Sequence, residues 1–182
     1  MEKYITRRHA ICYNKQSMSR IKNGYTIVEL IIVITVIGIL AAIVIVSYNG
    51  VQKRAQDAAV QSDLQGAADL LEGYRTRSLP RNYPSSAGNL TGISIKASKS
   101  SYKTTLPVNF IYCVDSSDYQ SFRLVGESKS AGIFSITQDG FSSQAYTESD
   151  LTTTFCSTKL GAGWTQINGM NPANTWSSWV GN

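Results

Sequence analysis

One carboxylate lies inside the longest apolar stretch of the sequence. Glu29 falls within a run from Tyr25 to Val46 that otherwise consists mostly of aliphatic residues. An ionised side chain is costly within a lipid bilayer, so it is retained where it has a partner or a task. The chemistry that this residue favours is pairing with a positive charge. The alternative is that its side chain reaches toward the lipid headgroups near the membrane surface.

Histidine chemistry is excluded from most of the chain. The one histidine, His9, lies near the N-terminus, so no histidine-based triad, histidine-assisted cysteine nucleophile or histidine-ligated metal can form after residue 24. Two acidic pairs, Asp115 with Asp118 and Glu148 with Asp150, could contribute to a Ca²⁺ site. They lack the spacing of an EF-hand and are interpreted as surface acids of turns. We expect no enzyme, no cofactor and no metal site.

The cysteines indicate a covalent cross-link. Cys12 lies in the basic N-terminal segment, which leaves Cys113 and Cys156. Two cysteines in a small exported domain favour one disulfide over two free thiols, which is the alternative. Closing a loop of about 44 residues would stabilise the domain by roughly 4 kcal/mol in the chain-entropy model.

The charge is distributed unevenly. The chain carries 17 Lys and Arg against 12 Asp and Glu, a formal net charge of +5. All of this excess lies in residues 1–24, where six basic residues oppose Glu2 alone, while residues 25–182 hold eleven of each sign. A basic segment before an apolar one is typical of a targeting signal, and it places the N-terminus in the cytoplasm and the C-terminal region outside. No specific nucleic-acid binding is inferred.

The apolar run and the sequence after it predict one long helix. As a helix, Tyr25–Val46 would span about 33 Å, enough to cross a bilayer core. Proline is absent from there to Arg77, so we expect a continuous helix about 80 Å long. Its second half carries two offset apolar stripes, which predict two burial partners: Tyr48, Val51, Ala55 and Ala59 form the earlier stripe, and Val60, Leu64, Ala67, Leu71 and Tyr74 the later one.

The rest of the chain has the pattern of a small β domain. Leu79–Pro80 and Tyr83–Pro84 should end the helix. Three segments rich in β-branched and aromatic residues then alternate with turn residues, which predicts an antiparallel meander: Asn109–Val114, Tyr119–Val125 and Ile133–Thr137. The last twenty or so residues contain three tryptophans, interpreted as packing in this domain, and their secondary structure is left unassigned.

The sequence Gly24-Tyr25-Thr26-Ile27-Val28-Glu29-Leu30 closely resembles the processing site of type IV prepilins. The resemblance covers roughly residues 20–77. It implies that a prepilin peptidase cuts between Gly24 and Tyr25 and methylates the new N-terminus at Tyr25. Cleavage creates an α-ammonium one helical turn from Glu29. The resemblance further implies that Glu29 pairs with the N-terminus of a neighbouring subunit during filament assembly.

The expected fold is α+β and pilin-like, with one long N-terminal helix packed on a small antiparallel sheet. The expected segments are a cleaved leader (1–24), a transmembrane or filament-core helix (25–46), its amphipathic continuation (47–77) and an extracytoplasmic head (78–182). Small residues in the first helical segment would allow close helix packing: Gly38, Ala41 and Ala42.

The expected function is that of a structural subunit of a type IV pilus-like filament. Its partners would be prepilin peptidase, other copies of itself and related pilins, the pilus assembly machinery and the cytoplasmic membrane, before it enters an extracellular filament. Two alternatives are a pseudopilin of a secretion or DNA-uptake machine and a membrane-tethered binding module.

Overall fold

The computed structural model describes residues 24–105, 108–170 and 175–181. The expected leader lies outside the described residues except for Gly24, and His9 and Cys12 lie outside them with it. The chain forms two compact units, Met1–Ile43 and Val44–Asn182.

The first unit holds the beginning of helix α1 (Ile27–Arg77), which has 51 residues. The helix begins two residues later than expected. Its large apolar side chains from Ile27 to Ile43 are all at least half exposed. Among the described residues, α1 is the one helix that is long and apolar enough to cross a membrane, by length and composition. No described residue of this unit, which the structure shows from Gly24 on, covers this apolar surface, and such a surface is suited to lipid or to another chain.

In the second unit, the end of α1 supplies one side of the core. The later apolar stripe is buried from Val60 to Leu71, as its helical spacing predicted, whereas Tyr74 at its end is half-buried. The earlier stripe is not: Tyr48 and Val51 are both 64% exposed. The chain therefore provides one of the two expected burial partners. The helix ends at Arg77, before the prolines that were expected to stop it.

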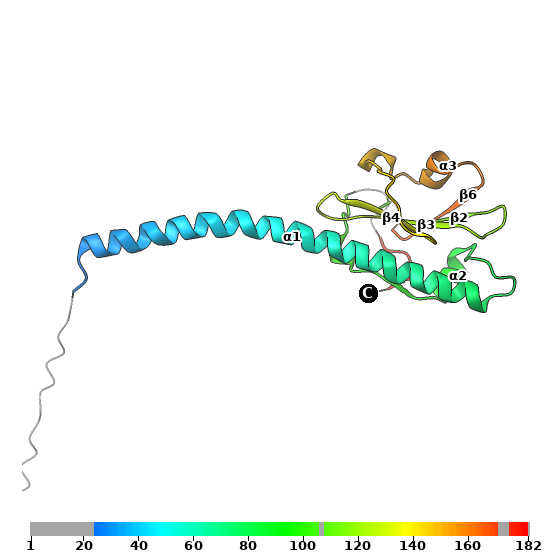
Figure 1. Ribbon diagram of the computed structural model, residues 1–182, viewed down its shortest axis with the longest axis horizontal. Helices are drawn as coiled ribbons and strands as arrows, with labels where there is room; N and C mark the ends of the chain where they lie inside the picture. Colours follow the sequence, from blue (N-terminus) through cyan, green and yellow to red (C-terminus); the bar gives the residue numbers. More distant parts are fainter. Residues whose placement is uncertain (1–23, 106–107, 171–174, 182) are drawn as a thin grey trace, which may run out of the picture. The chain divides into compact units, whose positions relative to one another are not determined.

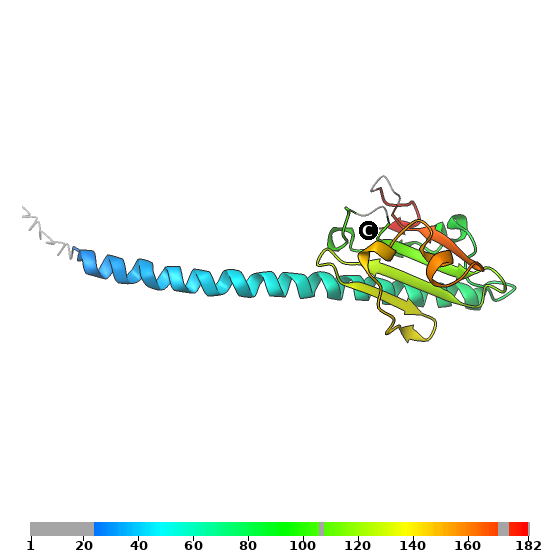
Figure 2. The same ribbon diagram turned by 90° about the horizontal axis from the view of Figure 1, so that it is seen from above.

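The head is built on a five-stranded antiparallel sheet with the strand order β5-β4-β3-β2-β6. Figures 1 and 2 show the last part of α1 lying along one face of this sheet and α3 on the opposite face. The strands are β2 (Phe110–Asp115), β3 (Phe122–Glu127), β4 (Ile133–Thr137), β5 (Gly140–Phe141) and β6 (Trp164–Asn168). The predicted meander is confirmed as β2–β4. The prediction missed β6, which pairs with the free edge of β2.

The remaining helices and strands of the head are short and lie outside the main sheet. The two-residue strands β1 and β7 pair in parallel and bring the C-terminal segment back to the chain that follows α1. The elements outside the main sheet are α2 (Ala87–Thr91), β1 (Ile95–Lys96), η1 (Lys99–Ser101), η2 (Glu148–Asp150), α3 (Phe155–Lys159) and β7 (Val180–Gly181).

Side chains alternate along β2 and so belong to two separate cores. Phe110, Tyr112 and Val114 pack with the buried stripe of α1. Ile111 and Cys113 pack on the other face, against residues of the segment that contains α3. The sheet is therefore the middle of three layers.

The tryptophans pack in the head, as interpreted from the sequence. Trp179 is 1% exposed, and its ring centroid lies 5.7 Å from that of Phe110. Trp176 meets Tyr102 edge to face, with a centroid distance of 5.3 Å. Trp164 packs against the second core.

Candidate assembly site

Glu29 is held in the first turn of α1 by Thr26. The Thr26 amide and hydroxyl both donate to Oε2 of Glu29, at 2.7 and 2.8 Å, and the Glu29 amide donates to Oγ1 of Thr26 at 3.2 Å. This reciprocal arrangement is a capping box, and it explains why the helix begins at Ile27. The role of Thr26 was missed in the sequence, although the Thr-x-x-Glu spacing is the signal of such a box.

The carboxylate retains unused acceptor capacity. Both bonds that it accepts go to Oε2, and Oε1 accepts none from the residues that the structure describes. A carboxylate can accept about four hydrogen bonds, so the capping box leaves room for a further donor. Gly24 and Tyr25 precede the helix and are exposed, Tyr25 to 89%. The peptide bond between them is not covered by the described part of the chain.

The three small residues expected at a helix interface are also exposed. Gly38, Ala41 and Ala42 lie on α1 within the first unit. A Cβ atom added at Gly38 would meet no atom within 4 Å. Glycine in a helix interior costs roughly 1 kcal/mol relative to alanine, and the described contacts of this chain give no reason for it here.

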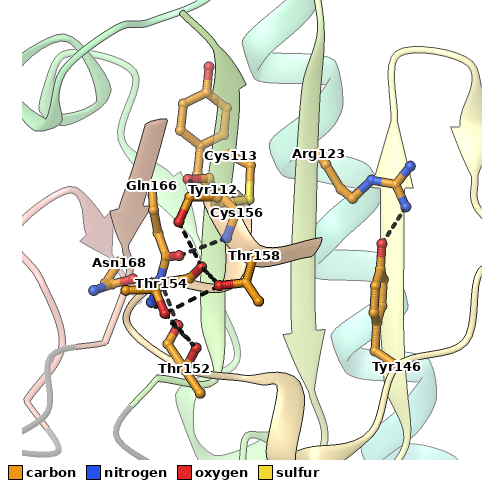
Figure 3. Close-up of a disulfide and its surroundings, with 11 residues drawn as sticks. Tyr112, Cys113, Arg123, Tyr146, Thr152, Thr154, Cys156, Thr158, Gln166 and Asn168 are labelled. Carbon is orange, nitrogen blue, oxygen red and sulfur yellow. Dashed lines mark hydrogen bonds between the residues drawn. A yellow bond between two sulfur atoms is a disulfide. The ribbon is translucent and has the colours of Figure 1, made fainter. Parts of the chain in front are cut away.

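The predicted disulfide between Cys113 and Cys156 is confirmed. The two sulfur atoms are 1.99 Å apart, the Cα atoms are 5.6 Å apart, and 43 positions separate the cysteines in sequence. The bond joins β2 to α3, and both cysteines are fully buried (Figure 3). It lies within the second core, where Ile111, Val125 and Phe155 surround it. The disulfide therefore fixes the outer layer of the head to the sheet.

Polar side chains reinforce this attachment (Figure 3). The backbone amide of Cys156 donates to Oε1 of Gln166 at 3.0 Å, and Nε2 of Gln166 donates to the Thr152 carbonyl at 2.9 Å. On the neighbouring part of the sheet, Nη1 of Arg123 donates to the Tyr146 hydroxyl at 2.8 Å. The whole segment before and through α3 is thus bonded to the sheet at several points.

A second set of contacts fixes the head to α1. The hydroxyls of Ser128 and Ser130, in the turn between β3 and β4, both donate to Oδ1 of Asp57. The Gly132 amide donates to the Ser128 hydroxyl at 3.0 Å. A Cβ atom at position 132 would lie only 2.7 Å from Oδ1 of Asp57 and 2.9 Å from the Phe134 ring. A side chain at position 132 would therefore have to displace the Asp57 carboxylate or the Phe134 ring.

We predict that Asp57→Ala lowers the free energy of unfolding by about 1–3 kcal/mol, since it removes a charged acceptor from two buried or half-buried hydroxyls. Urea unfolding of the full-length chain in a non-ionic detergent would measure this. Asp69→Ala is the matched control, because Asp69 is exposed and, among the described residues, accepts a side-chain hydrogen bond from Gln65 alone, one turn away on the same helix. An equal effect of the two variants would contradict a role for Asp57 in fixing the head.

Three acids of the two pairs, Asp115, Asp118 and Asp150, stabilise turns, as interpreted from the sequence, whereas Glu148 pairs with Lys103 at 2.5 Å. Oδ1 of Asp115 accepts from the amide and hydroxyl of Ser117, and these bonds lower the pKa of Asp115. Oδ1 of Asp118 accepts from the Gln120 amide at 2.8 Å. Asp150 accepts from Lys159 at 2.6 Å and from the Thr147 amide at 2.9 Å.

Protonation of Asp150 should lower the stability of the head at acidic pH. The hydrogen bond from Lys159, followed by that from the Thr147 amide, lowers the pKa of Asp150 from 3.8 to about 2. Its folded-state pKa is depressed, so its stabilising contribution is complete above about pH 4 and is lost as the pH falls through about 2.

We predict that the melting temperature of the wild-type chain falls between pH 4 and pH 2 more steeply than that of Asp150→Asn. Thermal unfolding followed by circular dichroism across this range would test it. Asp139→Asn, in the turn between β4 and β5, is the control and should keep the wild-type slope. Identical slopes for Asp150→Asn and the wild type would refute the assignment.

Two comparisons with known proteins bear on identity. Residues 19–45 match the family described as "Prokaryotic N-terminal methylation motif". The chain is also 30% identical over 117 residues to the "Type IV wide pilus major component PilA4" of Thermus thermophilus, a match that covers 64% of this chain and 82% of that protein. No solved structure matches the chain significantly.

A long N-terminal helix whose second half packs on an antiparallel sheet is the α+β arrangement of a pilin. The motif at its N-terminus and the relative just described agree with this arrangement. The chain belongs to the type IV pilin family, whose members are structural proteins and not enzymes. Its apolar helix and processing motif fit a membrane-anchored prepilin.

Proposed function

We propose that this chain is a structural subunit of a type IV pilus, made as a prepilin and assembled from the cytoplasmic membrane. The observation that carries the proposal is an apolar helix surface, exposed from Ile27 to Ile43, that lies within residues 19–45, the part of the chain that matches the methylation-motif family. The relative's role as a major pilus component favours a pilus over a secretion or DNA-uptake pseudopilus. Residues 1–24 would be the leader, 25–46 the membrane and filament-core segment, 47–77 its continuation and 78–182 the head outside the membrane.

Maturation would begin with cleavage between Gly24 and Tyr25 by prepilin peptidase and methylation of the new amine. The exposure of both residues supports access to this bond. Cleavage removes every excess positive charge of the chain and leaves an ammonium group at Tyr25.

Assembly would then pair this ammonium with Glu29 of a neighbouring subunit. Oε1 of Glu29, which accepts no hydrogen bond from a described residue, supports such a second interaction beside the capping box. The apolar surface would move from lipid into contacts between helices, with Gly38, Ala41 and Ala42 allowing close approach. The exposed stripe at Tyr48 and Val51 would acquire the burial partner that the single chain lacks.

The proposal is tested by blocking maturation. Gly24→Leu, expressed as the sole copy, should accumulate in the membrane as uncut precursor and yield no fibres that can be sheared from the cell. Gly24→Ala is the control, since it keeps a small residue before the cut and should be processed. Fibres built from uncut Gly24→Leu subunits would overturn the proposed order of maturation and assembly.

A further inference from the structure

A polar hollow of about 370 Å³ lies where α1 meets the turn between β3 and β4. Figures 1 and 2 show this turn beside the helix. The lining residues are Asn49, Gln52, Lys53, Gln56, Lys129 and Ser130. The first four follow the spacing i, i+3, i+4 and i+7 and therefore form one face of α1.

The walls of the hollow are fixed relative to each other. Asp57 lies one turn beyond Lys53 on α1 and accepts hydrogen bonds from Ser128 and Ser130. Lys129 lies between these two serines, and its amide donates to the Ser101 carbonyl at 2.7 Å. The turn that carries Lys129 is therefore attached to the helix face that carries Lys53.

The charges around the hollow favour an anion. Its lining holds two ammonium groups and three side-chain amides that can donate, and no described residue that lines it is acidic. Neither Lys53 nor Lys129 lies within 4 Å of a carboxylate oxygen in the described part of the chain. Asp57, the acid closest to Lys53 along the helix face, is engaged by the two serine hydroxyls.

The position of the hollow along α1 points to lipid as the source of this anion. Asn49 follows the end of the apolar run at Val46 by about 5 Å of helix, and Lys53 follows it by about 10 Å. A headgroup layer extends roughly 5–8 Å beyond the hydrocarbon core on each side of a bilayer, and a lysine can extend its ammonium back toward that layer. Tyr48, which precedes the lining residue Asn49, is 64% exposed. Tyrosine is enriched at membrane–water interfaces.

We infer that this hollow binds the phosphate of an anionic phospholipid while the subunit is inserted in the membrane, before it is assembled into a filament. Lys53 and Lys129 would face the phosphate, with the side-chain amide of Asn49 as a further donor. The inference rests on the membrane-inserted stage of the proposed function. Such a contact would hold the base of the head at the membrane surface before the helix leaves the lipid.

The test uses the full-length chain reconstituted in phosphatidylcholine vesicles that contain a minor fraction of phosphatidylglycerol. Electron paramagnetic resonance of spin-labelled lipids measures the preference of the chain for phosphatidylglycerol over phosphatidylcholine. Lys53→Gln and Lys129→Gln should each reduce this preference by roughly tenfold or more, the effect of losing one hydrogen bond to a charged group. The variants Lys53→Arg and Lys129→Arg should retain it.

Arg54→Gln is the matched control, because Arg54 lies at the same depth on α1 but does not line the hollow. Arg54→Gln should reduce the preference by no more than about fivefold, the diffuse contribution of one cation near an anionic surface. A loss as large as that of Lys53→Gln would indicate diffuse attraction and overturn the assigned site. If inorganic phosphate displaces the labelled lipid at constant ionic strength, the hollow binds free phosphate and the lipid assignment is wrong.

Flotation of the vesicles separates this inference from the proposed function. A chain that floats with the vesicles but shows no preference for phosphatidylglycerol would overturn the lipid site and leave the pilus proposal standing. A chain that fails to insert would contradict both.

Discussion

Glu29→Ala should be made, inserted and cleaved normally and yet enter fibres poorly, with fibre yield lower by roughly tenfold or more because a buried ammonium would be left unpaired at every subunit. Removing the carboxylate makes the helix more apolar, so insertion becomes easier. The head should fold normally, because Glu29 lies in the first unit of the chain and the head core lies in the second. Membrane-bound subunit and sheared fibre are measured with each variant as the sole copy.

Two further variants separate charge pairing from helix capping. Glu29→Asp keeps the charge with a shorter reach and should give an intermediate fibre yield. Thr26→Ala removes the capping hydroxyl that bonds to Glu29 but keeps the carboxylate, so it should assemble much better than Glu29→Ala. Normal fibre yield from Glu29→Ala would contradict the pairing mechanism. Loss of the variant from the membrane would instead assign Glu29 to insertion or folding.

Cys113→Ser should lower the free energy of unfolding of the head by about 4 kcal/mol, the chain-entropy value for a loop of this length. The effect should be large because the disulfide is fully buried and joins β2, an inner strand of the sheet, to α3. Urea unfolding of the full-length precursor in non-ionic detergent, without reductant, would measure the change.

Cys12→Ser provides the control for this measurement, since it removes a cysteine of the leader and should not alter unfolding of the head. The double variant Cys113→Ser/Cys156→Ser should behave like Cys113→Ser, because breaking the bond once removes the whole constraint on the unfolded chain. Unchanged stability in Cys113→Ser would show that contacts such as Gln166 with Cys156 suffice to hold α3.

Local patterns in the sequence predicted the elements that depend on local physics. The apolar run and the spacing of Val60, Leu64 and Leu71 predicted α1 and its buried face, because helical periodicity decides which side chains share a side. Alternating β-branched and aromatic residues predicted β2–β4, and turn residues predicted the ends of those strands.

Pairings between distant segments could not be predicted in this way. Strand β6 is short, lies among glycines and tryptophans, and is defined by its pairing with β2 some fifty residues earlier. The contact of Asp57 with Ser128 spans 71 positions, and neither residue carries a local signal for it. The hollow lined by Lys53 depends on that contact, so no local sequence pattern predicted it either. Thr26 differs, because its capping box is local and could have been found.

Intact-mass spectrometry of the subunit in fibres sheared from the cell surface tests the central claim most directly. The account predicts one species that begins at Tyr25, carries one added methyl group, and lacks two hydrogens relative to the reduced chain because of the Cys113–Cys156 bond. A fibre subunit that retains residues 1–24, or one cut within the apolar run near Ala42, would contradict it. Absence of the chain from surface fibres, with the protein present only as a membrane-bound monomer, would contradict its role as a pilus subunit.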